Sequence, residues 1–275
     1  MNVKRLYQIF HWLSLDVVAG AVVSYRVAAH LPDYHGAFDW PTAAVLGMVV
    51  FAIYTLDRLI DNRLSPPATD RHRFRHQYRQ RLVQVLLAML VLGIVALFFL
   101  PPSVLWWGLG LALTTVLYLF GVFRTGGRGW FEALKDVAVP LVYALGVWGT
   151  ATVAQPELSW EMLTLGGAFW LIAQQNLLLV AYFESFTTEE GHSLPIRWGE
   201  LTTRRVLQIM FWGVVLLAVA TVVFTSYRYP VRVAVVLMAM ASVQHWLWQH
   251  PNKWLAGTRY RNVSEAVFLL PLLVW

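Results

Sequence analysis

The chain has 275 residues, of which 58% are hydrophobic and 13% are charged. Soluble domains average about 45–50% apolar and about 25% charged residues, so this composition excludes a soluble globular domain, a disordered chain and a nucleic-acid-binding domain. The formal net charge of +6 comes with basic residues that lie between apolar segments, which is typical of membrane topology. We therefore expect an all-α integral membrane protein. The sequence holds no cysteine, which excludes disulfides, thiolate metal sites and cysteine nucleophiles.

Nine apolar segments are candidates for membrane-spanning helices. A spanning helix needs about 20 mostly apolar residues, and the last segment is short for a full span. We expect a single domain, 1–275, built as one bundle of about nine transmembrane helices around a central cavity with a polar mouth, and eight spans is the alternative. The segments are 6–30, 41–59, 82–100, 104–122, 133–154, 162–183, 206–225, 231–248 and 263–275.

The basic residues of the loops predict the orientation of the bundle. The N-terminal segment carries Lys4 and Arg5, and every second loop after it is basic, most of all 62–81 with its six Arg residues. Cytoplasmic loops carry such an excess, so we expect the N-terminus in the cytoplasm. One loop with Arg228 and Arg232 departs from the alternation. We expect a multi-pass protein of the bacterial inner (plasma) membrane.

Charged residues gather at one end of the expected bundle. Asp57, Asp61, Lys135, Glu184 and Glu265 all lie at predicted cytoplasmic ends of spans. Charged side chains near a span usually face the bundle interior rather than lipid. The pattern therefore indicates a polar cavity that opens to the cytoplasm.

Asp57 and Asp61 are four residues apart at the end of the second span. On a helix both carboxylates point to one face, where they repel each other unless a cation or a base lies between them. Mg²⁺ is the expected ion, because it binds a few carboxylates and completes its shell with water and substrate phosphate oxygens. The alternative is a pair of solvated acids at the membrane interface, matched by Arg58 and Arg63.

Three further features follow this DxxxD pattern in chain order. Tyr118 lies upstream of an Arg-rich turn, the run ALKDVAVP at 133–140 opens the fifth span, and the run SLPIRWG at 193–199 follows the sixth. Together the four features resemble the UbiA superfamily of intramembrane prenyltransferases. The resemblance covers nearly the whole chain in the order of its elements.

The resemblance implies a fold of nine transmembrane helices around a central cavity. It also implies an enzyme that binds a prenyl diphosphate through Mg²⁺ on aspartates, ionises it and alkylates an acceptor. In this chain the implied metal ligands are Asp57 and Asp61, with Glu184 and Glu189 as a second set.

Other roles are carried over from the resemblance in the same way. Lys135 and Arg128 are the implied catalytic residues, because a cation would stabilise the departing diphosphate. The residues implied to contact substrate are Tyr54, Tyr118, Arg124 and Asn176.

The second acidic motif departs from the family pattern. Its two Asp positions fall on Tyr182 and Phe186, and a shift by two residues offers Glu184 and Thr188 instead. In the first motif Ile53 stands where the family has Asn. We therefore expect the first metal site to be largely intact and the second to be degraded or rebuilt with Glu.

The basic residues predicted to bind the diphosphate also have a second interpretation. Lys135 stands where family members often carry a Lys that faces the diphosphate, but it would also serve as a cytoplasmic anchor paired with Glu132 or Asp136. Arg124 and Arg128 flank a glycine turn and would either close over a diphosphate or simply mark the cytoplasmic side.

Two function hypotheses follow. The first is a Mg²⁺-dependent transfer of a prenyl group from a polyprenyl diphosphate donor to a lipophilic acceptor, in contact with membrane lipid and without nucleic acid or an obligate protein partner. The second is a non-catalytic relative that binds a lipid or isoprenoid, or serves a partner protein. Glu184 facing Asp57 and Asp61 across one cavity would favour the enzyme, whereas lipid headgroups or Arg197 beside Glu184 would favour the second hypothesis.

Overall fold

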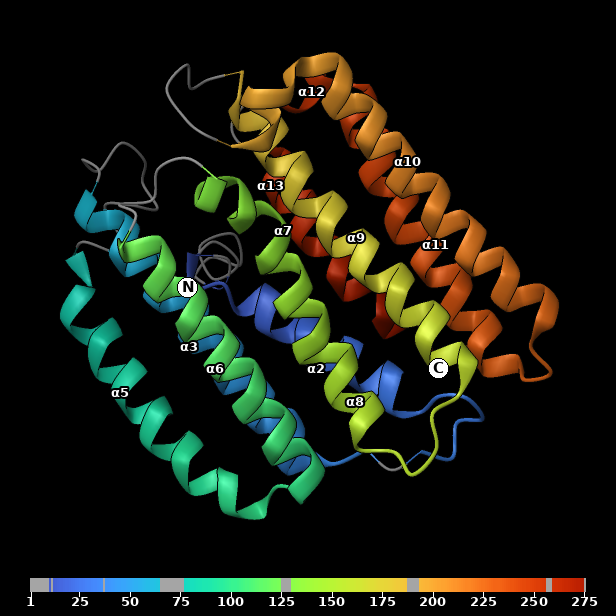
Figure 1. Cartoon of the computed structure of the whole chain (residues 1–275), viewed down its shortest axis with the longest axis horizontal. Helices are drawn as coiled ribbons and strands as arrows, with labels where there is room; N and C mark the ends of the chain where they lie inside the picture. Colours follow the sequence, from blue (N-terminus) through green and yellow to red (C-terminus); the bar gives the residue numbers. More distant parts are fainter. Residues whose placement is uncertain are drawn as a thin grey trace, which may run out of the picture. The chain divides into compact units, whose positions relative to one another are not determined.

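The computed structural model describes residues 10, 12–36, 38–64, 77–124, 130–186, 193–255 and 259–274. Within these ranges, the side chains of 57, 58, 60–64, 119, 122, 123, 130–133 and 135 lie outside the description. The described residues form helices and connecting turns, with no strand among them (Figure 1).

Each of the nine expected segments overlaps a helix in the described part of the chain. The elements are α2 (Leu15–Ala29), α3 (Trp40–Leu64), α5 (Arg79–Ala96), η1 (Leu97–Phe99), α6 (Pro102–Arg124), α7 (Trp130–Ala144), η2 (Leu145–Gly149), α8 (Thr150–Val153), α9 (Trp160–Glu184), α10 (Leu194–Phe224), α11 (Arg228–Gln249), α12 (Pro251–Trp254), α13 (Arg259–Ala266) and η4 (Val267–Leu273).

Five helical segments of the described residues are long and apolar enough to cross a membrane, and α3 and α6 contain shorter apolar stretches. The five segments are Arg79–Phe99, Asp136–Val153, Trp160–Glu184, Leu194–Phe224 and Arg228–Gln249. An all-helical protein with several candidate membrane spans is thereby confirmed. The bundle of nine spans, its orientation and the bacterial inner membrane stay predictions.

The chain divides into two compact units, and the expected single domain stays a prediction. Unit 1 comprises Met1–Val22 and Asp39–Pro101, and unit 2 comprises Val23–Phe38 and Pro102–Trp275. The boundary between them falls inside α2.

Unit 1 is built on α3, which packs against α5. Gly47 of α3 lies against the first half of α2, where a Cβ would meet Val22 and Val18 at 3.4 and 3.6 Å. The apolar side chains of α5 are mostly exposed, with Leu82 and Leu86 as its buried residues. An apolar helix that exposes most of its surface is suited to contact with lipid.

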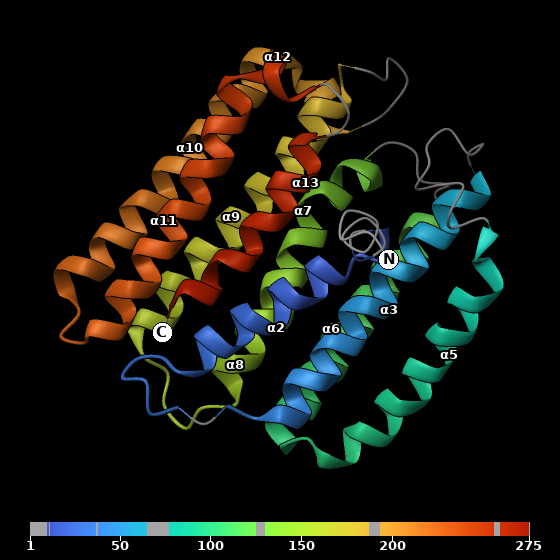
Figure 2. The ribbon, with the colours of Figure 1, turned by 180° about the vertical axis from the view of Figure 1, so that it is seen from behind.

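Unit 2 is centred on α9, which packs against α7, α10, α11 and α13 (Figures 1 and 2). Half of its span is buried, and Leu165, Phe169, Ile172 and Leu179 have no exposed surface. A helix that is apolar on all sides is typical of the core of a membrane bundle. α9 therefore positions two of the functional candidates of unit 2, Asn176 and Glu184.

Two glycines allow tryptophan rings to lie directly on helix backbones in unit 2. A Cβ at Gly149 would stand 2.6 Å from Trp107, and one at Gly166 would stand 2.6 Å from Trp148. The Trp107 indole donates to the Leu145 carbonyl at 3.1 Å, and Trp148 donates to the Met162 carbonyl at 2.9 Å. A larger residue at either glycine would clash with the tryptophan ring, because a ring packed against a helix backbone cannot easily move aside.

α10 begins at Leu194, twelve residues before the predicted span at 206. The helix bends at Gly199, whose φ of +75° favours glycine, and Thr203 donates to the Gly199 carbonyl at 2.8 Å. The expected loop between the sixth and seventh spans is therefore largely helical. The sequence analysis did not predict the first twelve residues of α10, because hydropathy detects only the apolar part of a helix.

Candidate functional site

α3 is a regular helix from Trp40 to Leu64, and it carries the first acidic pair near its end. Asp57 and Asp61 occupy successive turns of one helix face, as their spacing predicts. Their side chains lie outside the described residues. Tyr54, a predicted substrate contact, lies one turn before Asp57 on the same helix.

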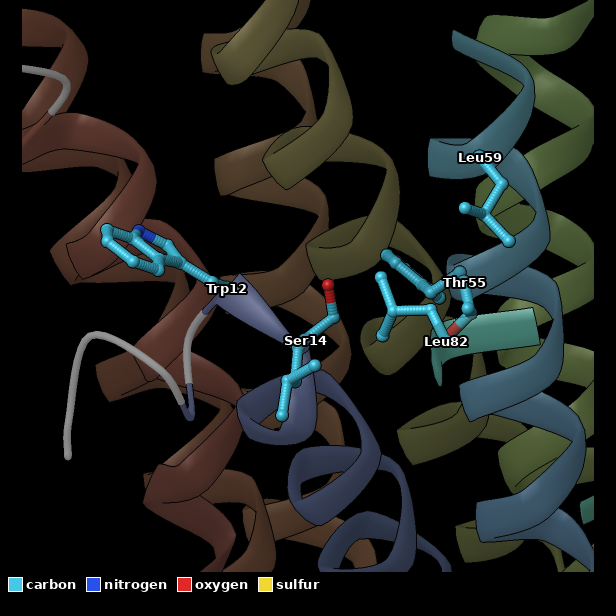
Figure 3. Close-up of a pocket in the computed structure, with 7 residues that line it drawn as sticks. Trp12, Ser14, Thr55, Leu59 and Leu82 are labelled. Atoms are coloured by element: carbon cyan, nitrogen blue, oxygen red, sulfur yellow. The ribbon is translucent and has the colours of Figure 1, made fainter. Parts of the chain in front are cut away.

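A small pocket in unit 1 opens beside this stretch of α3 (Figure 3). Its volume is about 10 Å³, enough for about one water molecule. The pocket is too small for a prenyl chain, so it does not by itself identify a donor site. Its lining residues are Trp12, Leu13, Ser14, Tyr54, Thr55, Leu59 and Leu82.

Asp136 fastens three helices of unit 2 together. Pro140 has no N–H to donate to the carbonyl of Asp136, and the Gln174 amide of α9 donates to that carbonyl at 2.7 Å instead. The Asp136 carboxylate accepts from the Leu194 N–H at 2.8 Å, at the first turn of α10 where backbone donors have no intrahelical partner. Tyr118, a predicted substrate contact on α6, interacts electrostatically with Asp136.

Glu184, a predicted metal ligand, forms an ion pair with α13. Arg261 lies 3.1 Å from Glu184 and 3.6 Å from Glu265. The Glu184 side chain is 46% exposed and that of Glu265 only 11%. The arginine therefore bridges a carboxylate near the surface and a buried one.

Tyr182, which the sequence resemblance places at an expected Asp position, is held by α10. The residue is 1% exposed, and its hydroxyl donates to Glu200 at 3.2 Å and accepts from Arg204 at 3.0 Å. Arg204 and Glu200 also pair with each other at 3.0 Å. Phe186, at the second Asp position, lies edge-on to Tyr182 at 5.0 Å between centroids. The two positions expected for a second acidic pair thus hold aromatic rings that pack against each other.

Tyr260 of α13 packs on the last turn of α9, just before the predicted ninth span. Its ring is stacked on Phe183 with centroids 4.5 Å apart. Burial raises the pKa of the Tyr260 phenol, the Glu184 carboxylate raises it further, and Arg261 opposes the shift. The phenol therefore stays protonated beside the ion pair at neutral pH.

The remaining predicted site residues are distributed as follows. Arg124 is exposed at the end of α6, with its guanidinium 5.4 Å from the Phe120 ring centroid. Asn176 lies in α9, and its side-chain oxygen is buried without a hydrogen-bond partner in the described part of the chain. Lys135 lies in α7 with its side chain outside the described residues, and Arg128 and Glu189 lie outside them entirely.

No group of three His, Asp or Glu side chains comes together as a metal site within the described residues. The side chains of Asp57, Asp61 and Glu189 lie outside the described part of the chain. A metal site at Asp57 and Asp61 therefore stays a prediction, and Glu184 has Arg261 as its counter-ion.

Sequence reasoning missed Arg204, which pairs with Glu200, and Arg261, which pairs with Glu184 and Glu265. Arg261 precedes Glu265 by four residues and Arg204 follows Glu200 by four, so the helical ion pairs were detectable from spacing. The bonds to Glu184 and Tyr182 were not, because they join residues on different helices.

Comparison of the chain with protein-family models, with curated proteins and with solved structures gave no match.

Proposed function

We propose that this protein is a UbiA-like prenyltransferase that works in the membrane and relies mainly on one acidic pair. Asp57 and Asp61 would hold Mg²⁺ and with it the diphosphate of a polyprenyl donor. The prenyl group would pass to a lipophilic acceptor. The observation that carries the proposal is the placement of two aspartates on successive turns of one face near the end of α3.

The donor set fits the metal. Carboxylate oxygens are the protein ligands that Mg²⁺ prefers, and two of them leave room in its shell for water and phosphate oxygens. Bound Mg²⁺ would neutralise the negative charge of the diphosphate. Arg124 has an exposed guanidinium at the end of α6, and together with Lys135 and Arg128 it would bind the departing diphosphate.

The transfer itself is an alkylation. The allylic carbon–oxygen bond of the donor breaks, diphosphate leaves with the electron pair, and a nucleophilic atom of the acceptor bonds to the allylic carbon and loses its proton. The chain's residues would bind the diphosphate, exclude water from the allylic cation and place the acceptor. Tyr54, Tyr118 and Asn176 are the proposed substrate contacts.

A second candidate function is a non-catalytic membrane protein that binds a lipid or isoprenoid, or serves a partner protein. It is favoured by the ion pair between Glu184 and Arg261 and by the Tyr182 hydroxyl network with Glu200 and Arg204. Acids already matched by arginines are poor metal ligands, because a cation would have to displace the guanidinium. An enzyme with this arrangement would have to work without the family's second acidic pair.

Two single substitutions test the proposal against its alternative. Asp57→Asn and Glu184→Gln each remove one charge and keep the side-chain shape, and each variant is measured for Mg²⁺-dependent diphosphate release. The proposal predicts that Asp57→Asn lowers turnover by about 10²–10³-fold, the usual loss when a contact to developing charge is removed. If Glu189 and Glu184 form a working second site, Glu184→Gln lowers turnover to a similar degree. A protein without turnover that co-purifies with a lipid would support the second candidate.

A further inference from the structure

Two glutamines in the core of unit 2 are completely buried and have unmatched amides. Gln175 of α9 and Gln244 of α11 each have 0% exposed surface. The side-chain oxygen and nitrogen of both residues have no hydrogen-bond partner among the residues that the structure describes. Their neighbour Gln174 is different, because its amide nitrogen donates to the Asp136 carbonyl at 2.7 Å.

The packing of α9 against α11 indicates that Gln175 and Gln244 lie on the same layer of the bundle. α9 and α11 pack side by side (Figures 1 and 2), and the next turn of each helix enters one cluster, in which Leu178 and Leu179 pack with Leu247 and Trp248. Residues three and four apart share a helix face, so both glutamines lie one turn from this cluster on its side of their helices.

The depth of the two residues agrees as well. Gln175 lies 15 residues after the start of α9, and Gln244 lies 16 residues after the start of α11. At about 1.5 Å per residue both are roughly 22–24 Å from the first residue of a candidate span. Gln175 lies nine residues before the end of α9 and Gln244 five residues before the end of α11, so both amides lie within helices of membrane-spanning length, in their C-terminal halves.

Such amides are costly unless something binds them. An unsatisfied buried polar group costs about 1–3 kcal/mol, and lipid offers no replacement for water. Polar groups inside a membrane bundle therefore usually serve a ligand or a partner. The indole N–H of Trp248, one turn from Gln244, is also buried and unmatched within the described ranges.

The chemistry of the amide selects the ligand. Each amide offers one acceptor and two N–H donors, and it carries no charge. A cation would use only the oxygens and leave the N–H groups unmatched, and an anion would do the reverse. A hydroxyl group both donates and accepts, so it can satisfy an amide oxygen and an amide nitrogen at once.

We propose that Gln175 and Gln244 form an intramembrane site for a neutral hydroxyl group. The hydroxyl belongs either to ordered water or to an alcohol dissolved in the membrane. The site requires neither Mg²⁺ nor a diphosphate, so it is independent of the proposed transferase and of the acids on α3.

The test uses the side-chain amide NMR signals of the wild-type protein in lipid nanodiscs, assigned through their own backbone signals. One arm measures cross-peaks between these amide protons and long-lived water. The other compares 1-decanol with decane, which has the same chain without the hydroxyl. Gln174 is the comparison, because its amide nitrogen already donates to the Asp136 carbonyl and only its oxygen is unmatched within the described residues.

Water cross-peaks at Gln175 and Gln244 support a water-filled site. A response of the same two signals to 1-decanol at about five- to tenfold lower concentration than to decane supports an alcohol site, since one hydrogen bond is worth about that factor. Gln175→Leu and Gln244→Leu should then each abolish the preference, and Gln174→Leu should retain it. The absence of water contacts together with equal responses to decane and decanol would overturn the proposal.

Discussion

Helix ends in the two units carry charges four residues apart and use this spacing in opposite ways. In unit 1, α3 places Asp57 and Asp61 on one face, where like charges repel. In unit 2, α10 pairs Glu200 with Arg204 at 3.0 Å, and α13 pairs Arg261 with Glu265 at 3.6 Å. Four-residue spacing therefore does not define a metal site by itself. The sign of the second charge decides whether the face attracts a cation or is already neutralised.

Asp61→Lys should have the largest effect, because it converts the acidic pair of α3 into an acid–base pair like those of unit 2. We expect at least about a 100-fold loss of Mg²⁺-dependent prenyl diphosphate binding, since one ligand is removed and a cation is placed beside the other. Equilibrium binding with and without Mg²⁺ measures the effect. Glu200→Gln is the control and should bind normally, and an unchanged Mg²⁺ dependence in Asp61→Lys would refute a metal role for this pair.

Arg261→Gln should show that the acid–base pair of α13 is structural. The substitution leaves the carboxylate of Glu265 buried without its guanidinium, and breaking such a buried pair costs about 3 kcal/mol of unfolding free energy. Reversible unfolding in mixed micelles measures the loss. Glu184→Gln is the matched control with an expected cost of about 0–1 kcal/mol, because Glu184 is nearly half exposed. A loss below about 1 kcal/mol in Arg261→Gln would contradict this view.

Asp136 is an acid that accepts a hydrogen bond from the start of α10 instead of forming an i,i+4 ion pair. Asp136→Ala removes the acceptor for the Leu194 N–H and should lower the unfolding free energy by about 2 kcal/mol. Asp136→Asn keeps an oxygen in place and should cost about half as much. The same unfolding assay applies, and equal losses in the two variants would show that the bond to Leu194 is not what matters.

The smallest expected effect is a change in the pH dependence of the unfolding free energy, and it comes from Tyr260. Its pKa in the folded protein is raised above the ordinary value of about 10. Above that pH the unfolded chain loses the phenol proton while the folded chain retains it, so stability is fully present below about pH 10 and declines as the pH rises further. Tyr260→Phe should flatten this decline in unfolding measured at several alkaline pH values. Identical slopes of unfolding free energy against pH in the wild type and in Tyr260→Phe would show that the raised pKa of Tyr260 does not cause the decline.

The fold was predictable where apolar residues dominate a segment that is long enough to span a membrane. The predicted segments at 162–183 and 231–248 agree with α9 and α11 to within three residues at each end, because hydropathy alone defines such helices. The start of α10 was missed, since its first turns are polar and are held by Asp136 from another helix.

The candidate site was predictable only where its residues are close in sequence. Spacing indicated the face shared by Asp57 and Asp61, and it could also have indicated Arg204 and Arg261. The bond from Glu184 to Arg261 depends on how α9 and α13 pack, which no local pattern encodes. The unmatched amides of Gln175 and Gln244 were equally hidden, because burial and missing partners are properties of the packed bundle.

The proposed function is tested most directly by diphosphate release from prenyl diphosphates of several chain lengths. The purified protein is incubated with Mg²⁺ and a lipophilic acceptor panel, in parallel with the Asp57→Asn, Asp61→Asn and Glu200→Gln variants. We predict release by the wild type and by Glu200→Gln, and a loss of about 10²-fold or more in both aspartate variants. Equal release by all four proteins would contradict a metal site on α3, and no release by the wild type with any donor and acceptor would contradict the transferase.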